Sequence, residues 1–263
     1  MNDAKIIAVT QPLIMDHIDM AENIIYKTPE EFIAYTARVS NPGNQNNNLT
    51  APKLLKYLIE HKHWSPFEMV SITMEINTTR DISHQIIRHR SFSFQEFSQR
   101  YADPTKDMQF VTREARLQDA KNRQNSIETD DEYIDNTWYS FQCSVIEDAR
   151  DTYENAINMG IAKEQVRAIL PEGLTTTRLY MSGTLRSWIH YIDVRAEAGT
   201  QKEHRQVALA AQEEILKHFP SLREYWYPDL DPNMPRFEDH WLPRNRSSVV
   251  EQEPKSWWWK FWS

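Results

Sequence analysis

The chain has 263 residues and a formal net charge of −8, and it is long enough for one large domain or two small ones with a substantial core. The acidic balance argues against broad non-specific binding of nucleic acid, which needs a surplus of lysine and arginine across one face. A single cysteine, Cys143, excludes both an intramolecular disulfide framework and a metal site built on cysteines.

The N-terminal part is predicted to mix a strand with helices. The β-branched run from Ile6 to Thr10 predicts a short strand. The segment Thr28-Pro29-Glu30-Glu31 is a capping box with proline at the first helical position, and it predicts a helix toward Val39. Asn41-Pro42-Gly43 should end this helix, and apolar spacing predicts a second helix from Ala51 to His61.

The next part should contain a strand and a helix. Apolar residues alternate with other residues from Met69 to Thr78, which predicts the strand. Asp81 is a good N-cap for a helix that extends to Arg90. Residues 91–98 are too rich in serine and phenylalanine for an assignment. The acidic and polar segment Gln118 to Asp131 is interpreted as a surface loop.

The longest predicted helix runs from Glu132 to Met159 and ends at Gly160. Its apolar positions keep helical spacing: they are Ile134, Trp138, Phe141, Val145, Ala149 and Ala156. A short helix is expected from Lys163 to Leu170, where Pro171 ends it.

The remaining elements complete the predicted fold class. Thr175 to Met181 should be a strand, and Leu185 to Arg195 a helix. Thr200-Gln201-Lys202-Glu203 is a capping box for a last helix, which Pro220 closes. We therefore predict an α+β fold with a mixed β-sheet flanked by helices.

We expect one domain over residues 1–220 and a Pro- and Trp-rich C-terminal extension over residues 221–263. No stretch approaches the run of about 20 apolar residues that a membrane span needs, and Met1 to Thr10 does not resemble a signal peptide. A cytoplasmic protein without membrane or metal is the expectation. The five glycines form neither GxGxxG nor GxxxxGK[ST], so a dinucleotide would be bound by another route.

Arginines on the helix after Asp81 can serve two anions. At about 100° per residue, Gln85, Arg88 and His89 share one helical face, while Arg90 lies about 200° round from Arg88.

Residues 88–101 crowd arginines, serines, a histidine and a glutamate into one short segment. Guanidinium groups bind phosphate bidentately, and hydroxyl groups can complete the oxygen shell. Arg88, Ser98 and Arg100 therefore fit a monophosphate, and Arg90 fits the phosphates of a second ligand. On these residues alone, a solvated basic patch paired with surface carboxylates explains the cluster equally well.

The same segment resembles the signature of the flavin-dependent thymidylate synthases. Arg88-His89-Arg90 is followed after seven residues by Ser98, and Ser-x-Arg-Tyr then continues as it does in that family. A second block, His63-Trp64-Ser65-Pro66-Phe67-Glu68, is similar to another family element, although it can also be read as a plain capping box.

Further similarity lies downstream, at residues 167–171 and 183–195, and more weakly at residues 37–40, so that the resemblance covers roughly residues 30 to 215. Four positions depart from the family's common residues and put individual flavin contacts in doubt: Met69, Gln95, Thr184 and His190.

The resemblance implies conversion of dUMP to dTMP, with methylenetetrahydrofolate as the carbon donor and FAD reduced by NADPH as the hydride source. It further implies a homotetramer with active sites between subunits. The implied dUMP residues are Gln85, Ile86, Ile87, Arg88, Glu96, Phe97, Ser98, Gln99, Arg100, Arg167 and Arg195. The implied FAD residues are Ser65, Arg88, His89, Arg90, Glu96, Thr184, Leu185, Arg186 and His190.

Arg195 is our candidate for the catalytic role of polarising the uracil and stabilising charge at its N3. Cys143 has no histidine or lysine neighbour in sequence that would activate its thiol, which favours a route without a covalent enzyme nucleophile. Two alternatives stay open: one-carbon transfer to another pyrimidine nucleotide, and a non-enzymatic module in which residues 88–101 bind single-stranded nucleic acid.

Overall fold

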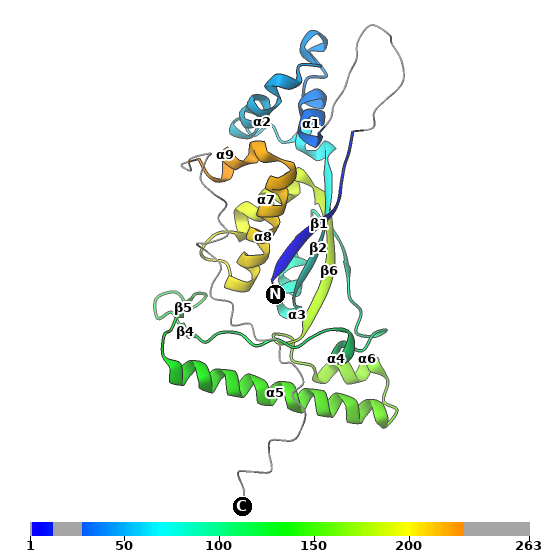
Figure 1. Ribbon diagram of the computed structural model, residues 1–263, viewed down its shortest axis with the longest axis vertical. Coiled ribbons are helices and arrows are strands. Elements are labelled where there is room, and N and C mark those ends of the chain that lie inside the picture. Colours follow the sequence, from blue (N-terminus) through cyan, green and yellow to red (C-terminus); the bar gives the residue numbers. More distant parts are fainter. Residues whose placement is uncertain (1, 13–27, 229–263) are drawn as a thin grey trace, which may run out of the picture. The chain divides into compact units, whose positions relative to one another are not determined.

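The computed structural model of the chain describes residues 2–12 and 28–228 (Figure 1). By their internal contacts these residues form two compact units, one of residues 2–97 and 177–228 and one of residues 98–176. From residue 229 onward, the predicted C-terminal extension lies outside the described residues. No helix in the described ranges is long and apolar enough to cross a membrane.

The first unit is built on a four-stranded sheet in the order β1-β2-β6-β3. Its strands are β1 (Asp3–Val9), β2 (Ser71–Thr79), β6 (Thr176–Thr184) and β3 (Ser93–Glu96). Strand β1 runs antiparallel to β2, and β3 runs antiparallel to β6. Between β2 and β6, Thr73 contacts Ser182 and Glu75 contacts Tyr180, so rising numbers on one strand meet falling numbers on the other.

The α+β class is confirmed, but the prediction of a mixed sheet is wrong, because these neighbouring strands are all antiparallel. Hydrophobic periodicity locates a strand without giving its direction, which depends on how the chain returns between strands. The three predicted strand regions do belong to this sheet. Strand β3 was not assigned from the sequence, and it forms the edge beside β6.

The sheet is covered by helices that follow it in sequence. Ile72, Met74 and Ile76 of β2 are fully buried, as the predicted alternation requires. Helix α7 (Leu185–Arg195) starts directly after β6, and its Trp188 donates an indole N–H to the carbonyl of Ile72 at 3.1 Å. Helix α8 (Lys202–His218) packs on β1, β2 and α7. Both helices are thereby held against the sheet.

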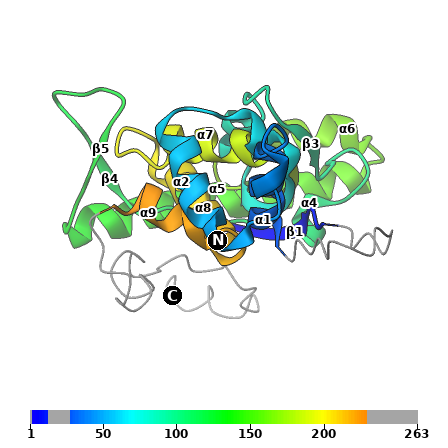
Figure 2. The same cartoon turned by 90° about the horizontal axis from the view of Figure 1, so that it is seen from above.

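Helices α1 (Pro29–Ala37) and α2 (Ala51–Glu60) lie side by side in both views of the molecule (Figure 2). The side chain of Thr28 accepts a hydrogen bond from the N–H of Glu31 at 3.2 Å, which confirms the predicted cap. Two 3₁₀ turns connect these helices, at Pro42–Asn44 and Asn48–Thr50.

Two other predicted capping boxes are wrong in detail. Ser65 lies inside a 3₁₀ helix, η3 (Ser65–Met69), whose N-cap position is Trp64 and has no side-chain cap. The N-cap position of α8 is Gln201, not Thr200. Its amide donates to Glu203 at 2.9 Å, whereas the Thr200 hydroxyl faces the carbonyl of Val194. A capping pattern in sequence is realised only when the backbone enters the helix at that residue.

Helix α3 spans only Arg80–Ile86, with Thr79 at its N-cap position and Asp81 in its first turn. The predicted extension to Arg90, with Asp81 as the cap, is wrong. Residues 87–92 form turns that return the chain to β3, so Gln85 and the following arginines do not share a helical face. The sheet decides this boundary, because β3 must pair with β6.

The second unit is organised around α5 (Glu132–Asn158), whose N-cap Asp131 accepts from two backbone N–H groups. Gly160 ends it with a φ of 82°, the left-handed conformation that glycine adopts readily. The other elements of this unit are α4 (Pro104–Asp107), β4 (Arg116–Gln118), β5 (Ser126–Glu128), α6 (Lys163–Val166) and the 3₁₀ turn η4 (Arg167–Ile169). The predicted loop after residue 118 therefore contains part of a two-stranded hairpin, β4–β5.

The buried face of α5 agrees only in part with the predicted one. Gln142, Ile146 and Tyr153 are buried, whereas Trp138, Phe141 and Val145 are 41%, 60% and 47% exposed. Of the other predicted positions, Ala149 is buried as expected and Ala156 packs against the core of this unit, so spacing identified the buried face only in part. The polar Gln142 concealed the true face, because its amide is satisfied by the backbone N–H and carbonyl of Arg113.

Candidate functional site

Arg195 and His89 form a directed pair in the first unit. Arg195 is the last residue of α7, and its Nε donates to Nε2 of His89 at 2.9 Å. A guanidinium group can only donate, so Nε2 of His89 must be the acceptor, and the neutral ring carries its proton on Nδ1. Burial, reinforced by the charge of Arg195, lowers the pKa of His89 to about 4. His89 is thus a neutral hydrogen-bonding group near pH 7 and a weak base.

This pairing leaves donors available on both partners. The terminal nitrogens of Arg195 bond none of the described residues, and neither does Nδ1 of His89. Arg195 is half-buried, so its free N–H groups can stabilise negative charge in partly desolvated surroundings. Neighbouring Arg88 and Arg90 are exposed.

Gln85 belongs to a polar cluster on the core side of this pair. Its side-chain amide lies 2.7 Å from Gln201 and 3.2 Å from His204. The second ring nitrogen of His204 lies 3.1 Å from the hydroxyl of Tyr191, whose ring contacts His89 edge-on with centroids 4.9 Å apart. Sequence reasoning missed His204 and Tyr191. The only available signal was a polar residue on the apolar stripe of a helix.

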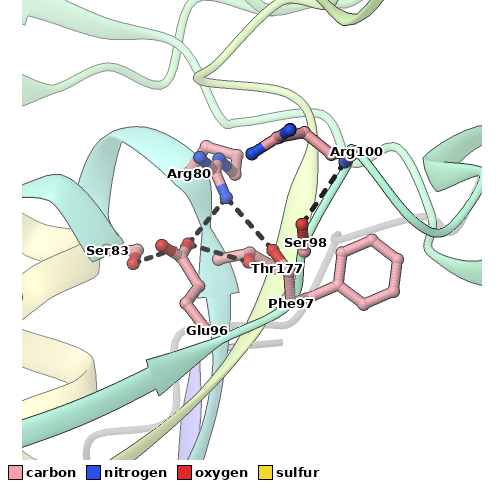
Figure 3. A network of polar contacts seen from close by, with 7 residues as sticks. All are labelled: Arg80, Ser83, Glu96, Phe97, Ser98, Arg100 and Thr177. Atoms are coloured by element: carbon pink, nitrogen blue, oxygen red, sulfur yellow. Dashed lines mark hydrogen bonds and ion pairs between the residues drawn. The ribbon is translucent and has the colours of Figure 1, made fainter. Parts of the chain in front are cut away.

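Glu96 ends β3 in a network of donors (Figure 3). Its Oε1 accepts from Arg80 at 3.0 Å, from Ser83 at 2.9 Å and from Thr177 at 2.9 Å. Arg80 also reaches the carbonyl of Phe97 at 3.5 Å. Within the described part of the chain Oε2 has no partner, so Glu96 presents one fixed, unoccupied acceptor. The three donors were not predicted, since nothing in the sequence links them to Glu96.

The start of α7 and the η3 turn form a second region. Thr184 caps α7, accepting from the N–H of Ser187 at 3.3 Å, a role that an asparagine would also fill. The N–H of Leu185 donates to the carbonyl of Val70 at 2.8 Å, and Arg186 pairs with Glu68 of η3. The structure thus brings the residues Thr184, Leu185 and Arg186 close to the turn that begins at Ser65.

Phe92 anchors the segment that carries the arginines. Its ring lies against Gly183 of β6, where an added Cβ would meet ring carbons at 2.5 and 2.7 Å. The same ring packs edge-on against Trp188, with centroids 4.9 Å apart. Gly183 is required here because only a residue without a side chain lets the ring approach the strand.

The other predicted site residues lie as follows. Ile86 is buried, and Ile87 and His190 are exposed; Phe97 follows β3 and is half-buried. Met69 and Gln95, two of the positions that depart from the family's common residues, are also exposed.

Four of the residues predicted to bind dUMP belong to the second unit. Ser98 accepts from the backbone N–H of Arg100 at 3.4 Å, which forms a turn (Figure 3). The exposed guanidinium of Arg100 lies 3.4 Å from Glu164, and Arg167 is exposed at the start of η4. Gln99 is buried.

Comparison with known proteins gives consistent matches. A family model described as thymidylate synthase complementing protein (Thy1) matches residues 23–221. The chain is 49% identical over 221 residues to a flavin-dependent thymidylate synthase of Synechocystis sp., covering 84% of this chain and 97% of that protein. It is also 49% identical over 219 residues to a probable flavin-dependent thymidylate synthase of Paramecium bursaria Chlorella virus 1, covering 83% and 96%.

A solved structure shares the fold. It is the UMP/dUMP methylase PolB from Streptomyces cacaoi bound with 5-Br UMP, with a TM-score of 0.67 and 21% identity over 85% of this chain and 92% of that one.

Proposed function

The chain belongs to the flavin-dependent thymidylate synthases, and from this premise we propose that it converts dUMP to dTMP with methylenetetrahydrofolate as carbon donor and FAD, reduced by NADPH, as hydride source. The observation that carries the proposal is the 49% identity that extends over almost the whole length of two named relatives. The Arg195–His89 pair, inside the matched region, supplies chemistry that suits it.

The residues present fit a flavin dinucleotide. Exposed Arg88 and Arg90 can bind phosphate oxygens, and the start of the eleven-residue helix α7 adds the positive end of a helix dipole, although its Leu185 and Ser187 N–H groups already have partners. Nδ1 of His89 can donate to a ring acceptor. These groups replace the glycine-rich loop that the sequence lacks. When bound and reduced, FAD would supply the hydride that completes the methyl group.

The chain's own residues would bind dUMP and polarise its ring. Gln85 and Arg88 of one subunit, together with Glu96 and the following residues to Arg100 of another, would hold the nucleotide. Arg195 would donate its free N–H groups to the uracil and stabilise the negative charge that N3 carries once its proton has left to solvent, while C5 attacks the one-carbon unit. The N–H···N bond to His89 orients the guanidinium, and the C5 proton leaves to solvent.

No enzyme nucleophile is needed in this scheme. Cys143 is a half-buried residue of α5 and makes no hydrogen bond to a described histidine or lysine that would activate its thiol. Cys143→Ala is therefore expected to keep turnover close to wild type. A folded Cys143→Ala protein without activity would contradict the non-covalent route.

We further propose a homotetramer with active sites between subunits. The exposed apolar stripe of α5, which includes Trp138, Phe141 and Val145, supports burial at an interface, because large exposed apolar patches are uncommon on monomers. Light scattering after gel filtration would give the mass of the assembly. A monomer at micromolar concentration would refute this part.

A comparison of three nucleotides as substrates tests which one the protein methylates. Product formation from dUMP, UMP and dCMP would be followed by chromatography, with FAD, NADPH or methylenetetrahydrofolate left out in turn. We expect dTMP from dUMP only in the complete mixture, and loss of activity in Arg195→Ala and Arg88→Ala. Methylation of another nucleotide in preference to dUMP would move the assignment to that substrate.

A further inference from the structure

His204 is a buried histidine with both ring nitrogens in hydrogen bonds. It lies on the apolar face of α8 with Val207, Ala208 and Ala211, and its exposed fraction is 0%. Nδ1 lies 3.2 Å from Oε1 of Gln85, and Nε2 lies 3.1 Å from the hydroxyl of Tyr191. Because both ring nitrogens of a buried histidine need partners, these two bonds fix the orientation of the ring.

The direction of every hydrogen bond in this cluster follows from one carboxylate. Glu203 accepts at Oε2 from Nε2 of Gln201 at 2.9 Å, so the amide oxygen of Gln201 faces away from it. That oxygen accepts from Nε2 of Gln85 at 2.7 Å, which turns the amide oxygen of Gln85 toward His204. Since this oxygen can only accept, Nδ1 of His204 must carry the proton.

The chain of hydrogen bonds is complete at its other end. With its proton on Nδ1, His204 offers a lone pair at Nε2, and the Tyr191 hydroxyl donates to it. The order of donation is Tyr191, His204, Gln85, Gln201, Glu203. Each member polarises the next, and none can reverse without breaking the bond to the carboxylate. Burial, with the nearby charge of Arg195, lowers the pKa of His204 to about 3, in agreement with a neutral ring.

We propose that His204 is a positioning residue that locks the side-chain amide of Gln85 in one of its two orientations and thereby fixes what Gln85 can offer the nucleotide. In this orientation the second N–H of Gln85 remains available, because its first N–H is used by Gln201. The half-buried amide thus presents a donor to an acceptor oxygen of the bound nucleotide. The inference rests on the proposed function, since the contact between Gln85 and dUMP belongs to it.

Three substitutions separate this role from simple space filling. In His204→Asn the amide nitrogen lies near the position of Nδ1 and can still donate to Gln85. In His204→Gln the polar group reaches the position of Nε2, close to Tyr191, and Gln85 loses its donor. His204→Leu removes both bonds. Val207→Ala, one turn further on α8, is a matched control that removes buried volume without touching the chain of hydrogen bonds.

The measured quantity is the Kd of dUMP for the flavin-loaded protein, determined by calorimetry beside the melting temperature and the flavin content. We expect His204→Leu and His204→Gln to weaken dUMP binding about tenfold, the effect of losing one orienting hydrogen bond. His204→Asn should recover most of this loss. Val207→Ala should lower the melting temperature without changing the Kd. Equal Kd values for the asparagine and glutamine variants, or a wild-type Kd in His204→Leu, would overturn the proposal.

A second measurement uses only the wild-type protein, so it does not depend on whether a variant folds. In protein labelled with ¹⁵N-histidine, the shifts of His204 should show a neutral ring protonated at Nδ1, the less common tautomer of free histidine. Protonation at Nε2 would overturn the proposal. dTMP formation by the wild type is assayed in parallel. Absence of dTMP formation by the wild type would count against the proposed function. Normal dTMP formation together with Kd values of the His204 variants that differ from those expected would count against the role of His204 alone.

Discussion

The buried, neutral His204 predicts a specific loss of stability in mild acid. Its folded-state pKa of about 3 is far below its usual value of 6.5. Below pH 6.5 the unfolded chain binds a proton at this residue and the folded protein does not, so folding becomes less favourable as the pH falls toward 3. The contribution of His204 should shrink by about 2 kcal/mol between pH 7 and pH 5, since each pH unit well below 6.5 costs about 1.4 kcal/mol.

Urea unfolding of the flavin-free protein at pH 7, 6 and 5, at one protein concentration, measures this loss. Other groups also contribute to the pH dependence of the wild type. They include carboxylates and His89, whose lowered pKa likewise makes the folded protein less stable as the pH falls. His204→Asn keeps these groups and removes one titration. The free energy of unfolding should therefore fall by about 2 kcal/mol more in the wild type than in the variant over this range. Parallel pH dependence of the two proteins would refute the assignment of a neutral, buried His204.

Further predictions concern the packing of Gly183 and the network around Glu96. Gly183→Ala should destabilise the protein by about 1–3 kcal/mol, because the ring of Phe92 occupies the space of the new methyl group. Gly43→Ala, where no atom lies within 4 Å, is the control, and equal melting temperatures for both variants would contradict the packing. Thr177→Val should cost about 1 kcal/mol by removing a hydroxyl donor from Glu96, and Thr177→Ser should restore it. If valine and serine behave alike in urea unfolding, this hydrogen bond has no energetic role.

Local sequence signals predicted those elements whose ends are set by local chemistry. Helix α7 spans Leu185–Arg195 as expected, because β-rich residues precede it and Thr184 can cap it. Helix α1 begins at Pro29 for the same kind of reason, since Thr28 caps it and proline fits the first turn. Such features depend on a few neighbouring residues and are therefore visible in the sequence.

Features that depend on distant partners could not be predicted. Helix α3 ends at Ile86 because the chain must turn to pair β3 with β6, a contact across more than eighty residues of sequence. The face of α5 that carries Gln142 can be buried because this side chain bonds the backbone of Arg113, a partner that spacing does not reveal.

The candidate site shows the same division. The Arg-His-Arg motif located the segment around His89, and the bond from Arg195 joins two segments that were predicted separately. The residues that hold these groups in place, such as His204 and Thr177, come from other elements and form no local pattern. Motif reasoning therefore located groups proposed to touch ligands, and the structure added the groups that orient them.

Tritium release from dUMP labelled at C5 tests the central claim most directly. The anaerobic assay would contain FAD, NADPH and methylenetetrahydrofolate, each omitted in turn, and would follow tritium in water together with dTMP. The account predicts release matched by dTMP formation, and neither in the absence of FAD or NADPH. A folded, flavin-loaded protein that binds dUMP but releases no tritium from C5 would contradict it.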